Sequence, residues 1–185
     1  MSPSIAIILA AGGSSRMGRC KALLPVDGKP LVMCHISALS ACSTVVVVGH
    51  QAPAVRRAVL GAATVFNPDW ASTQPSDSVR VALAALPDAT GILVTPVDVP
   101  PADSTVTTAL MGLPVSAVPV GEDGFEGHPV WVTGSELARL RRGPVDGGLR
   151  ALLSHAKRVV VPGVLGADFD DQAAFDAYVL TRTRG

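Results

Sequence analysis

The first 25 residues of the sequence contain a glycine-rich turn with basic side chains beside it. The segment Gly13-Ser-Ser-Arg-Met-Gly18 fits the first half of the P-loop pattern G-x-x-x-x-G-K-[ST], but Lys21 comes two residues late and Ala22 stands where Ser or Thr is required. Backbone N–H groups with little side-chain bulk around them can turn toward phosphates, and cations add matching charge. The cations are Arg16, Arg19 and Lys21. We therefore predict a phosphate loop of another kind, with a glycine-rich turn carrying solvated basic residues as the alternative.

Two sets of carboxylates can serve a cation at the same site. Asp98, in Thr95-Pro-Val-Asp98-Val-Pro-Pro, follows an apolar run and suits Mg²⁺, which takes one or two carboxylates plus substrate phosphates. A helix cap is the alternative role, although Asp103 is the better candidate for that cap. One carboxylate of Asp168-Phe-Asp170-Asp171 can complete the metal site, or this cluster simply begins the last helix.

Four further residues are open candidates. His50 follows an apolar strand and is either a turn residue or part of the site, and Trp70 either stacks on an acceptor ring or buries itself. His128 is either a loop residue or a functional one. Cys20 lies beside Lys21, which favours a lowered thiol pKa.

Short β-branched runs alternating with helical patterns must position these residues. Each of the first strands ends at Gly, Asn or Pro, and Pro or Ser begins the helices. The expected strands are residues 5–9, 44–48, 64–66, 91–95, 115–118, 130–132 and 158–161. The expected helices are residues 30–42, 53–60, 78–86, 104–111, 136–141, 149–155 and 172–180. This alternation predicts right-handed βαβ units and a mostly parallel sheet, which binds ligands at the carboxyl ends of its strands.

The composition limits the class of protein. The 185 residues favour a single domain over 1–185, and 48% hydrophobic but only 4% aromatic residues suit an aliphatic α/β core. Fifteen basic and fifteen acidic residues leave no block of charge for nucleic acid or an anionic membrane, so we expect small-molecule partners. Three Cys without metal spacing and a short apolar N-terminal run with no preceding cation favour the cytoplasm over secretion.

Seven short motifs together resemble the MobA-like nucleotidyltransferases. They follow in the family's order over nearly the whole chain, and the first is the most specific. They are LAAGGSSRMG (9–18), KALLP (21–25), GKPL (28–31), NPDW (67–70), PVDVP (96–100), GHPV (127–130) and DFD (168–170).

The resemblance implies a Rossmann-like α/β fold of the nucleotide-diphospho-sugar transferase type, a mostly parallel sheet with helices on both faces. It implies Mg²⁺-dependent transfer of a nucleotidyl group from a nucleoside triphosphate to a phosphorylated acceptor such as molybdopterin, with release of pyrophosphate. Ala10-Ala11-Gly12 is more similar to the members that use CTP than to those that use GTP. A molybdoenzyme or its chaperone is the implied protein partner.

The resemblance also implies a role for each matching residue. Arg16, Lys21 and Asp98 are the implied catalytic residues, and Asp98 with Asp170 holds the metal. His128 and Trp70 lie on the acceptor side. The nucleotide is bound by Leu9, Ala10, Ala11, Gly12, Gly13, Ser14, Ser15, Gly18, Asn67 and Ser78.

Two other functions remain as alternatives. A dinucleotide-dependent oxidoreductase would use a similar sheet, but no G-x-G-x-x-G follows the first strand. A non-catalytic carrier or accessory protein of the molybdenum cofactor would keep the pocket without turnover. The segment 71–79 departs from the family pattern, since Pro75 and Asp77 stand where the family has Gly followed by Ser-Leu. This departure bears on the identity of the acceptor and of the base.

Overall fold

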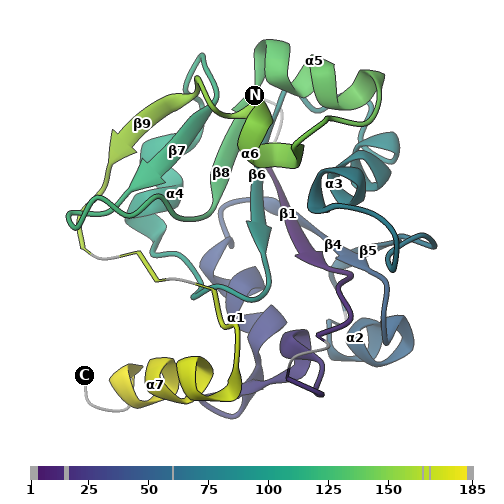
Figure 1. The fold of residues 1–185 in the computed structure, drawn as a ribbon, viewed down its shortest axis with the longest axis vertical. Coiled ribbons are helices and arrows are strands. Elements are labelled where there is room, and N and C mark those ends of the chain that lie inside the picture. The colour runs from purple at the N-terminus through teal and green to yellow at the C-terminus, as the bar shows by residue number, and fades with distance from the viewer. Residues whose placement is uncertain (1–3, 15–16, 60, 164, 167, 183–185) are drawn as a thin grey trace.

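A seven-stranded sheet with the order β5-β4-β1-β6-β8-β7-β9 forms the centre of the molecule (Figure 1), as seen in a computed structural model. The structure describes residues 4–14, 17–59, 61–163, 165–166 and 168–182. The strands of the sheet are β1 (Ile5–Ala10), β4 (Ser43–Val48), β5 (Ala63–Phe66), β6 (Gly91–Pro96), β7 (Ala117–Val120), β8 (Val130–Thr133) and β9 (Lys157–Val160). The strand boundaries lie within two residues of those expected from the sequence.

Only β8 runs against the other strands of this sheet. The pairs β1–β4, β1–β6, β4–β5 and β7–β9 are parallel, whereas β8 is antiparallel to both β6 and β7. The carboxyl ends of β1, β4, β5, β6, β7 and β9 therefore share one edge. Because β8 is reversed, its first residue, Val130, lies at that same edge. The prediction of a mostly parallel sheet is confirmed.

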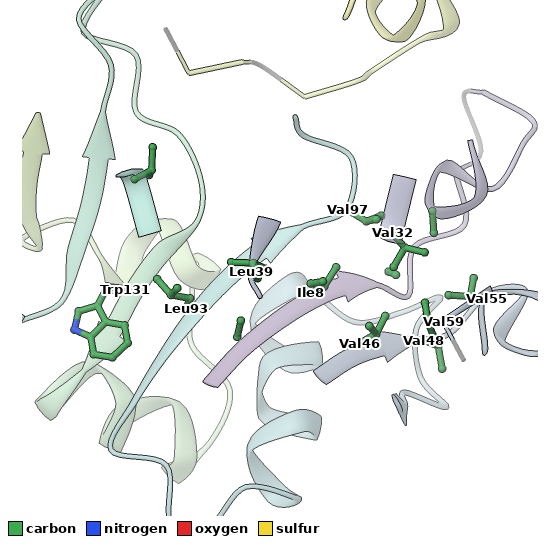
Figure 2. Close-up of a cluster of buried hydrophobic side chains, with 14 of the residues drawn as sticks. Ile8, Val32, Leu39, Val46, Val48, Val55, Val59, Leu93, Val97 and Trp131 are labelled. Carbon is green, nitrogen blue, oxygen red and sulfur yellow. The ribbon is translucent and has the colours of Figure 1, made fainter. Parts of the chain in front are cut away.

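Helices cover both faces, because alternate residues of the buried strands point to opposite sides. Ile8, Val46 and Leu93 pack on one side with α1, α2 and α4 (Figure 2). Ile7, Val47 and Ile92 pack on the other with α3, α5 and α6. The helices are α1 (Leu31–Ala38), α2 (Ala52–Ala58), α3 (Pro75–Ala84), α4 (Ser104–Leu110), α5 (Gly134–Arg142), α6 (Gly148–Leu152) and α7 (Gln172–Arg182).

Three helices differ from the expected ranges by three residues or more at one end. One of them, α6, ends at Leu152 and not at the expected residue 155. α3 begins at Pro75, three residues earlier than expected, because proline is favoured at the first helical position. Asp77 supports this start, since its carboxylate accepts the backbone N–H of Gln74 at 3.1 Å and pairs with Arg80. α1 stops at Ala38, before the expected Cys42, where a serine-rich turn leads into β4.

A small third cluster joins the two ends of the chain. A one-turn 3-10 helix, η1 (Lys21–Leu23), leads into the hairpin of β2 (Pro25–Val26) and β3 (Lys29–Pro30), neither of which the sequence pattern predicted. Leu24 and Val26 pack there with Leu31 of α1 and with the aromatic rings of Phe169 and Phe175 near the C-terminus. α7 accordingly lies below the sheet beside the N-terminal elements (Figure 1).

None of the helices in the described ranges combines the length and the apolar character that a bilayer crossing requires.

Candidate active site at the carboxyl edge of the sheet

A cleft of about 310 Å³ opens where β1 and β6 end. Its walls come from the glycine-rich loop after β1, from the segment before and at the start of α3, and from the end of β6. Many residues expected at the site from the sequence line it, namely Leu9, Ala10, Ala11, Gly12, Ser14, Lys21, Trp70, Ser78 and Asp98. Ligand binding at the carboxyl ends of parallel strands is the general rule for such sheets.

The glycine-rich loop is closed on itself by Ser14. Ser14 has a positive φ of 51°, which is uncommon for residues other than Gly, Asn or Asp. Its carbonyl oxygen accepts the N–H groups of Met17 and Gly18 at 3.2 Å each. Its hydroxyl accepts the backbone N–H of Lys21 at 3.1 Å. Ser14 therefore fixes the position of the backbone at Lys21 relative to the glycine-rich loop. The predicted residues Ser15 and Arg16 lie outside the described residues.

Lys21 and Asp98 meet at the cleft although they are 77 residues apart. The Lys21 Nζ donates to Asp98 Oδ2 at 2.8 Å, with side chains 12% and 32% exposed. Partial burial strengthens the pair relative to a surface ion pair. The loop lysine and the predicted metal carboxylate thus face the same space.

Two glycines make room for Trp70 on one wall of the cleft. A Cβ at Gly49 would lie 2.5 Å from the Trp70 Cβ and 2.6 Å from the Ala11 carbonyl oxygen. A Cβ at Gly13 would lie 3.2 Å from the indole ring, which also contacts the His50 ring at 4.9 Å between centroids. His50 therefore supports Trp70, and its backbone N–H donates to the Ala11 carbonyl at 3.0 Å.

Asn67 holds the segment before α3 in place from behind the surface of the cleft. It is 1% exposed, its amide nitrogen donates to the hydroxyls of Thr73 and Ser78 at 3.0 and 3.1 Å, and its amide oxygen accepts the N–H of Asp69. Thr73 and Ser78 both line the cleft. Asn67 thus holds cleft residues in place, and its predicted contact with a nucleotide remains a prediction.

His128 reaches the same edge of the sheet because β8 is reversed. It immediately precedes the cis peptide bond to Pro129 at the amino end of β8. Within the described residues its buried Nδ1 has no hydrogen-bond partner. Burial lowers the pKa of His128, and the nearby carboxylates of Asp168 and Asp98 oppose that shift only in part. The ring is therefore neutral at pH 7.

The acidic segment also lies beside Asp98, and Asp168 is the carboxylate coupled to it. The Phe169 N–H donates to the Asp98 carbonyl at 2.6 Å. Partial desolvation and the negative charge of Asp98 raise the pKa of Asp168, against a lowering effect of His128. The sequence pointed to Asp170 as the second metal ligand; Asp168 is a second candidate for that role.

This arrangement fits Mg²⁺ held mainly by its substrate rather than by a cage of protein ligands. In the described part of the chain no three His, Cys, Asp or Glu side chains gather in a metal-binding group. Mg²⁺ commonly takes only one or two carboxylates, with phosphates and water completing the shell. Partial desolvation and the nearby charge of Asp98 raise the pKa of Asp168, so a divalent cation would stabilise the charged form of this carboxylate.

The expectation for Cys20 was wrong. Cys20 lines the cleft beside Lys21, but burial raises the pKa of its thiol, against weaker lowering by the backbone of Ala22 and Leu23. A protonated thiol is a poor nucleophile. Desolvation outweighs the proximity of Lys21 in the sequence.

Several residues in or beside the cleft were not singled out as site residues from the sequence. Thr73, Gln74 and Pro75 line the cleft and belong to the segment that departs from the family pattern. His35, 1% exposed on α1, shares a 3.1 Å hydrogen bond between its Nε2 and the Val99 carbonyl next to Asp98. A histidine on the apolar run of residues 31–36 was the available signal. Of the predicted nucleotide-binding residues, Gly13 and Gly18 belong to the loop without lining the cleft.

The chain is similar to known nucleotidyltransferase-related proteins over most of its length. Residues 6–159 match the family model described as the MobA-like NTP transferase domain. A molybdenum cofactor guanylyltransferase from Xanthomonas euvesicatoria is 37% identical over 112 residues, covering 60% of this chain and 52% of that protein. The bifunctional protein GlmU from Rubrobacter xylanophilus is 43% identical over 100 residues, covering 50% of this chain and 21% of GlmU. The chain thus spans about half and about a fifth of these two relatives.

A solved structure agrees with the fold over the whole chain. Rv0371c from Mycobacterium tuberculosis superposes with a TM-score of 0.81 at 26% identity, covering 96% of this chain and 98% of that one. A second structure of Rv0371c, a complex with manganese, gives a TM-score of 0.80 at 24% identity, covering 97% and 100%. The predicted fold class is therefore confirmed.

Proposed function

Because the chain belongs to the MobA-like NTP transferase family, we propose that it is a divalent-metal-dependent nucleotidyltransferase. It transfers a nucleoside monophosphate from a nucleoside triphosphate to a phosphorylated acceptor and releases pyrophosphate. The observation that carries the proposal is the Lys21–Asp98 pair at 2.8 Å beside the glycine-rich loop. A cation and a carboxylate meeting in a cleft with exposed backbone suit triphosphate better than a neutral ligand.

The chemistry needs positioning and charge neutralisation more than a strong base. A phosphate monoester has a second pKa of about 6, so at neutral pH the acceptor is mostly a dianion. One of its oxygens attacks the α-phosphorus, the bond from that phosphorus to the bridging oxygen breaks, and pyrophosphate leaves with the electron pair. Lys21 neutralises charge that builds on the leaving group, and the loop around Ser14 cradles the phosphates.

Asp98, together with Asp170 or Asp168, would hold Mg²⁺ or Mn²⁺ at this site. A bound divalent cation supplies positive charge that screens the phosphates from one another. The manganese complex of Rv0371c makes Mn²⁺ a suitable test ion.

CTP is the proposed nucleotide and molybdopterin the proposed acceptor. The Ala10-Ala11-Gly12 sequence favours CTP. The relative from Xanthomonas euvesicatoria is named a guanylyltransferase, so GTP is the competing substrate. Trp70, which lines the cleft, and His128 at the adjacent strand start are proposed to face the acceptor. A molybdoenzyme or its chaperone is the proposed recipient of the product.

Pyrophosphate release measured with each of ATP, CTP, GTP and UTP tests the proposal. Each nucleotide is assayed with and without Mg²⁺, and with molybdopterin and simpler phosphorylated acceptors. Metal-dependent release with CTP and molybdopterin supports the full proposal, and preference for GTP corrects the nucleotide alone. Tight molybdopterin binding without release from any nucleotide would favour the non-catalytic carrier. Reduction of NAD(P)⁺ by a substrate would favour the oxidoreductase.

A further inference from the structure

Phe169 is an aromatic residue between Asp168 and Asp170, the two candidates for the second metal carboxylate beside Asp98. We call its side chain the aromatic anchor. Phe169 is 2% exposed, whereas Asp168 and Asp170 on either side are exposed. The Asp170 N–H donates to the Asp168 carbonyl at 3.0 Å, which closes a tight turn centred on Phe169. The Phe169 N–H donates to the Asp98 carbonyl at 2.6 Å. One buried residue thus ties the acidic segment to Asp98, the second residue after β6.

The anchor ring is held by the C-terminal helix. It packs edge-on against Phe175 at 5.4 Å between centroids and lies 5.0 Å from the Tyr178 ring, and both partners belong to α7. Leu24 and Val26 close the cluster from the hairpin side. Edge-to-face and offset ring pairs of this kind fix geometry as well as burying area. The position of Phe169 therefore depends on α7.

α7 is fastened to the segment that follows Lys21 as well. The Arg182 Nε donates to the Asp27 carboxylate at 3.1 Å, and the Arg182 Nη1 donates to the Tyr178 hydroxyl at 3.3 Å. Asp27 lies in the turn of the β2–β3 hairpin, which begins four residues after Lys21. One helix thus contacts both Phe169, which bonds to the Asp98 carbonyl, and the hairpin that follows Lys21. It lies beyond residues 6–159, the range that the family model matches.

We propose that Phe169 is a positioning residue, clamped by Phe175 and Tyr178, and that α7 thereby holds the carboxylates of the acidic segment beside Asp98. The proposal rests on the proposed function, because these carboxylates matter to turnover only if they share a divalent cation with the nucleotide. Loss of the clamp weakens metal binding while the loop that binds the phosphates stays intact.

Hydrogen exchange of the metal-free protein tests the clamp without any ligand. Phe175→Ala removes one ring of the clamp, and Phe175→Leu is the milder variant should the first fail to fold. We expect amide exchange of residues 168–171 to become faster in either variant, because the Phe169 N–H to Asp98 bond opens more often. Tyr178→Phe keeps the ring that contacts Phe169 and loses only the hydroxyl that accepts from Arg182, so residues 168–171 should exchange at the wild-type rate. Leu110→Ala, a buried truncation on α4, controls for general destabilisation.

Titration of the same variants with Mn²⁺, alone and with CTP, tests the positioning. Removing a group that orients metal ligands typically weakens metal affinity by about 10- to 100-fold, and we expect a loss of that size in the Phe175 variants. CTP affinity in metal-free buffer should stay at the wild-type level. Leu110→Ala should lower the melting temperature without changing the Mn²⁺ affinity.

The possible outcomes separate this proposal from the proposed function. Unchanged exchange at residues 168–171 in the folded Phe175 variants overturns the clamp. Faster exchange with Mn²⁺ affinity still within about twofold of wild type overturns the positioning role. A wild-type protein that binds neither Mn²⁺ nor CTP refutes the proposed function instead, and the exchange measurements then decide by themselves whether α7 holds the segment.

Discussion

The two halves of the sheet differ in strand length and in the number of paired residues. We call the half that contains β4, β1 and β6 the firm half, because its strands are longer and pair over more residues than β8, β7 and β9 do. β1, β4 and β6 have six residues each, and β1 pairs with β4 over six positions and with β6 over five. β7, β8 and β9 have four residues each, and β7 and β8 share one paired position. The firm half carries the glycine-rich loop and Lys21, whereas His128 and the acidic segment join from the other half and the C-terminus. The proposed phosphate cradle would need fixed backbone groups, whereas the proposed acceptor side, built on loops, could differ between relatives.

The largest expected effect on turnover is at Asp98, which follows β6, where the two halves of the sheet meet. Asp98→Asn keeps the shape of the side chain but removes the charge that pairs with Lys21 and that a metal ion requires. We expect no metal-dependent turnover. The check is pyrophosphate release across a Mg²⁺ titration. A titration curve that matches the wild type would mean that Asp98 holds no metal.

Lys21→Ala tests whether the firm half carries the charge for catalysis. Removal of a transition-state charge partner typically costs about 10²-fold or more in turnover, and we expect that loss. Lys29→Ala is the matched control, because Lys29 lies exposed on the nearby hairpin and changes the net charge equally. Turnover of Lys21→Ala within about threefold of wild type would remove Lys21 from the mechanism.

His35, on α1 beside the firm half of the sheet, makes the stability of the folded protein depend on pH. Burial lowers the pKa of His35 from 6.5 to about 4, while the Val99 carbonyl opposes this shift. The unfolded chain therefore binds a proton below pH 6.5 that the folded chain refuses until about pH 4, so stability falls as pH drops through this window. The full shift corresponds to about 3 kcal/mol.

Thermal unfolding of wild type and His35→Gln between pH 7.5 and about 4 measures this contribution. Gln can still donate to the Val99 carbonyl but does not titrate. We expect a flatter pH dependence in the variant. Equal slopes for the two proteins would show that other groups cause the loss of stability.

Two identical substitutions compare the halves directly and give the smallest effects. Val46 on β4 is fully buried, whereas Val160 on β9 is 74% exposed. Val46→Ala should destabilise the fold by about 2 kcal/mol through lost burial and a residual cavity. Val160→Ala should change stability by less than about 0.5 kcal/mol. Urea unfolding of both variants checks the difference, and equal effects would contradict the contrast drawn between the halves.

The fold was predictable where the pattern is local. Residues 44–48 and 91–95 read as strands because β-branched runs ending in Gly or Pro suit a buried parallel sheet, and both form strands. The hairpin after Lys21 escaped prediction, because strands of two residues leave no periodicity to detect. Pro75 and Asp77 were the local signals for the early start of α3. We had interpreted them as departures from the family pattern and not as residues that begin a helix.

The site was predictable only in part. Residues 9–12 and Lys21 lie close together in the sequence, and they do line the cleft. Gln74 and Thr73 belong to the segment 71–79, which the sequence indicated only as a whole; their place in the fold shows that these two residues line the cleft. Cys20 was misjudged because its burial, which raises the thiol pKa, cannot be read from its neighbours along the chain.

The amino-acid sequence was sufficient to predict the fold class, the loop after the first strand and the strand ends that face one edge. These features depend on residues near one another in the chain, where turn chemistry and periodicity act. The meeting of Lys21 and Asp98 across 77 residues could be seen only in the folded chain, as could the reversal of β8 that brings His128 to the same edge. The same holds for the contacts by which α7 holds Phe169 beside Asp98. Such contacts depend on strand order and direction, which close packing of the whole core selects and no local segment encodes.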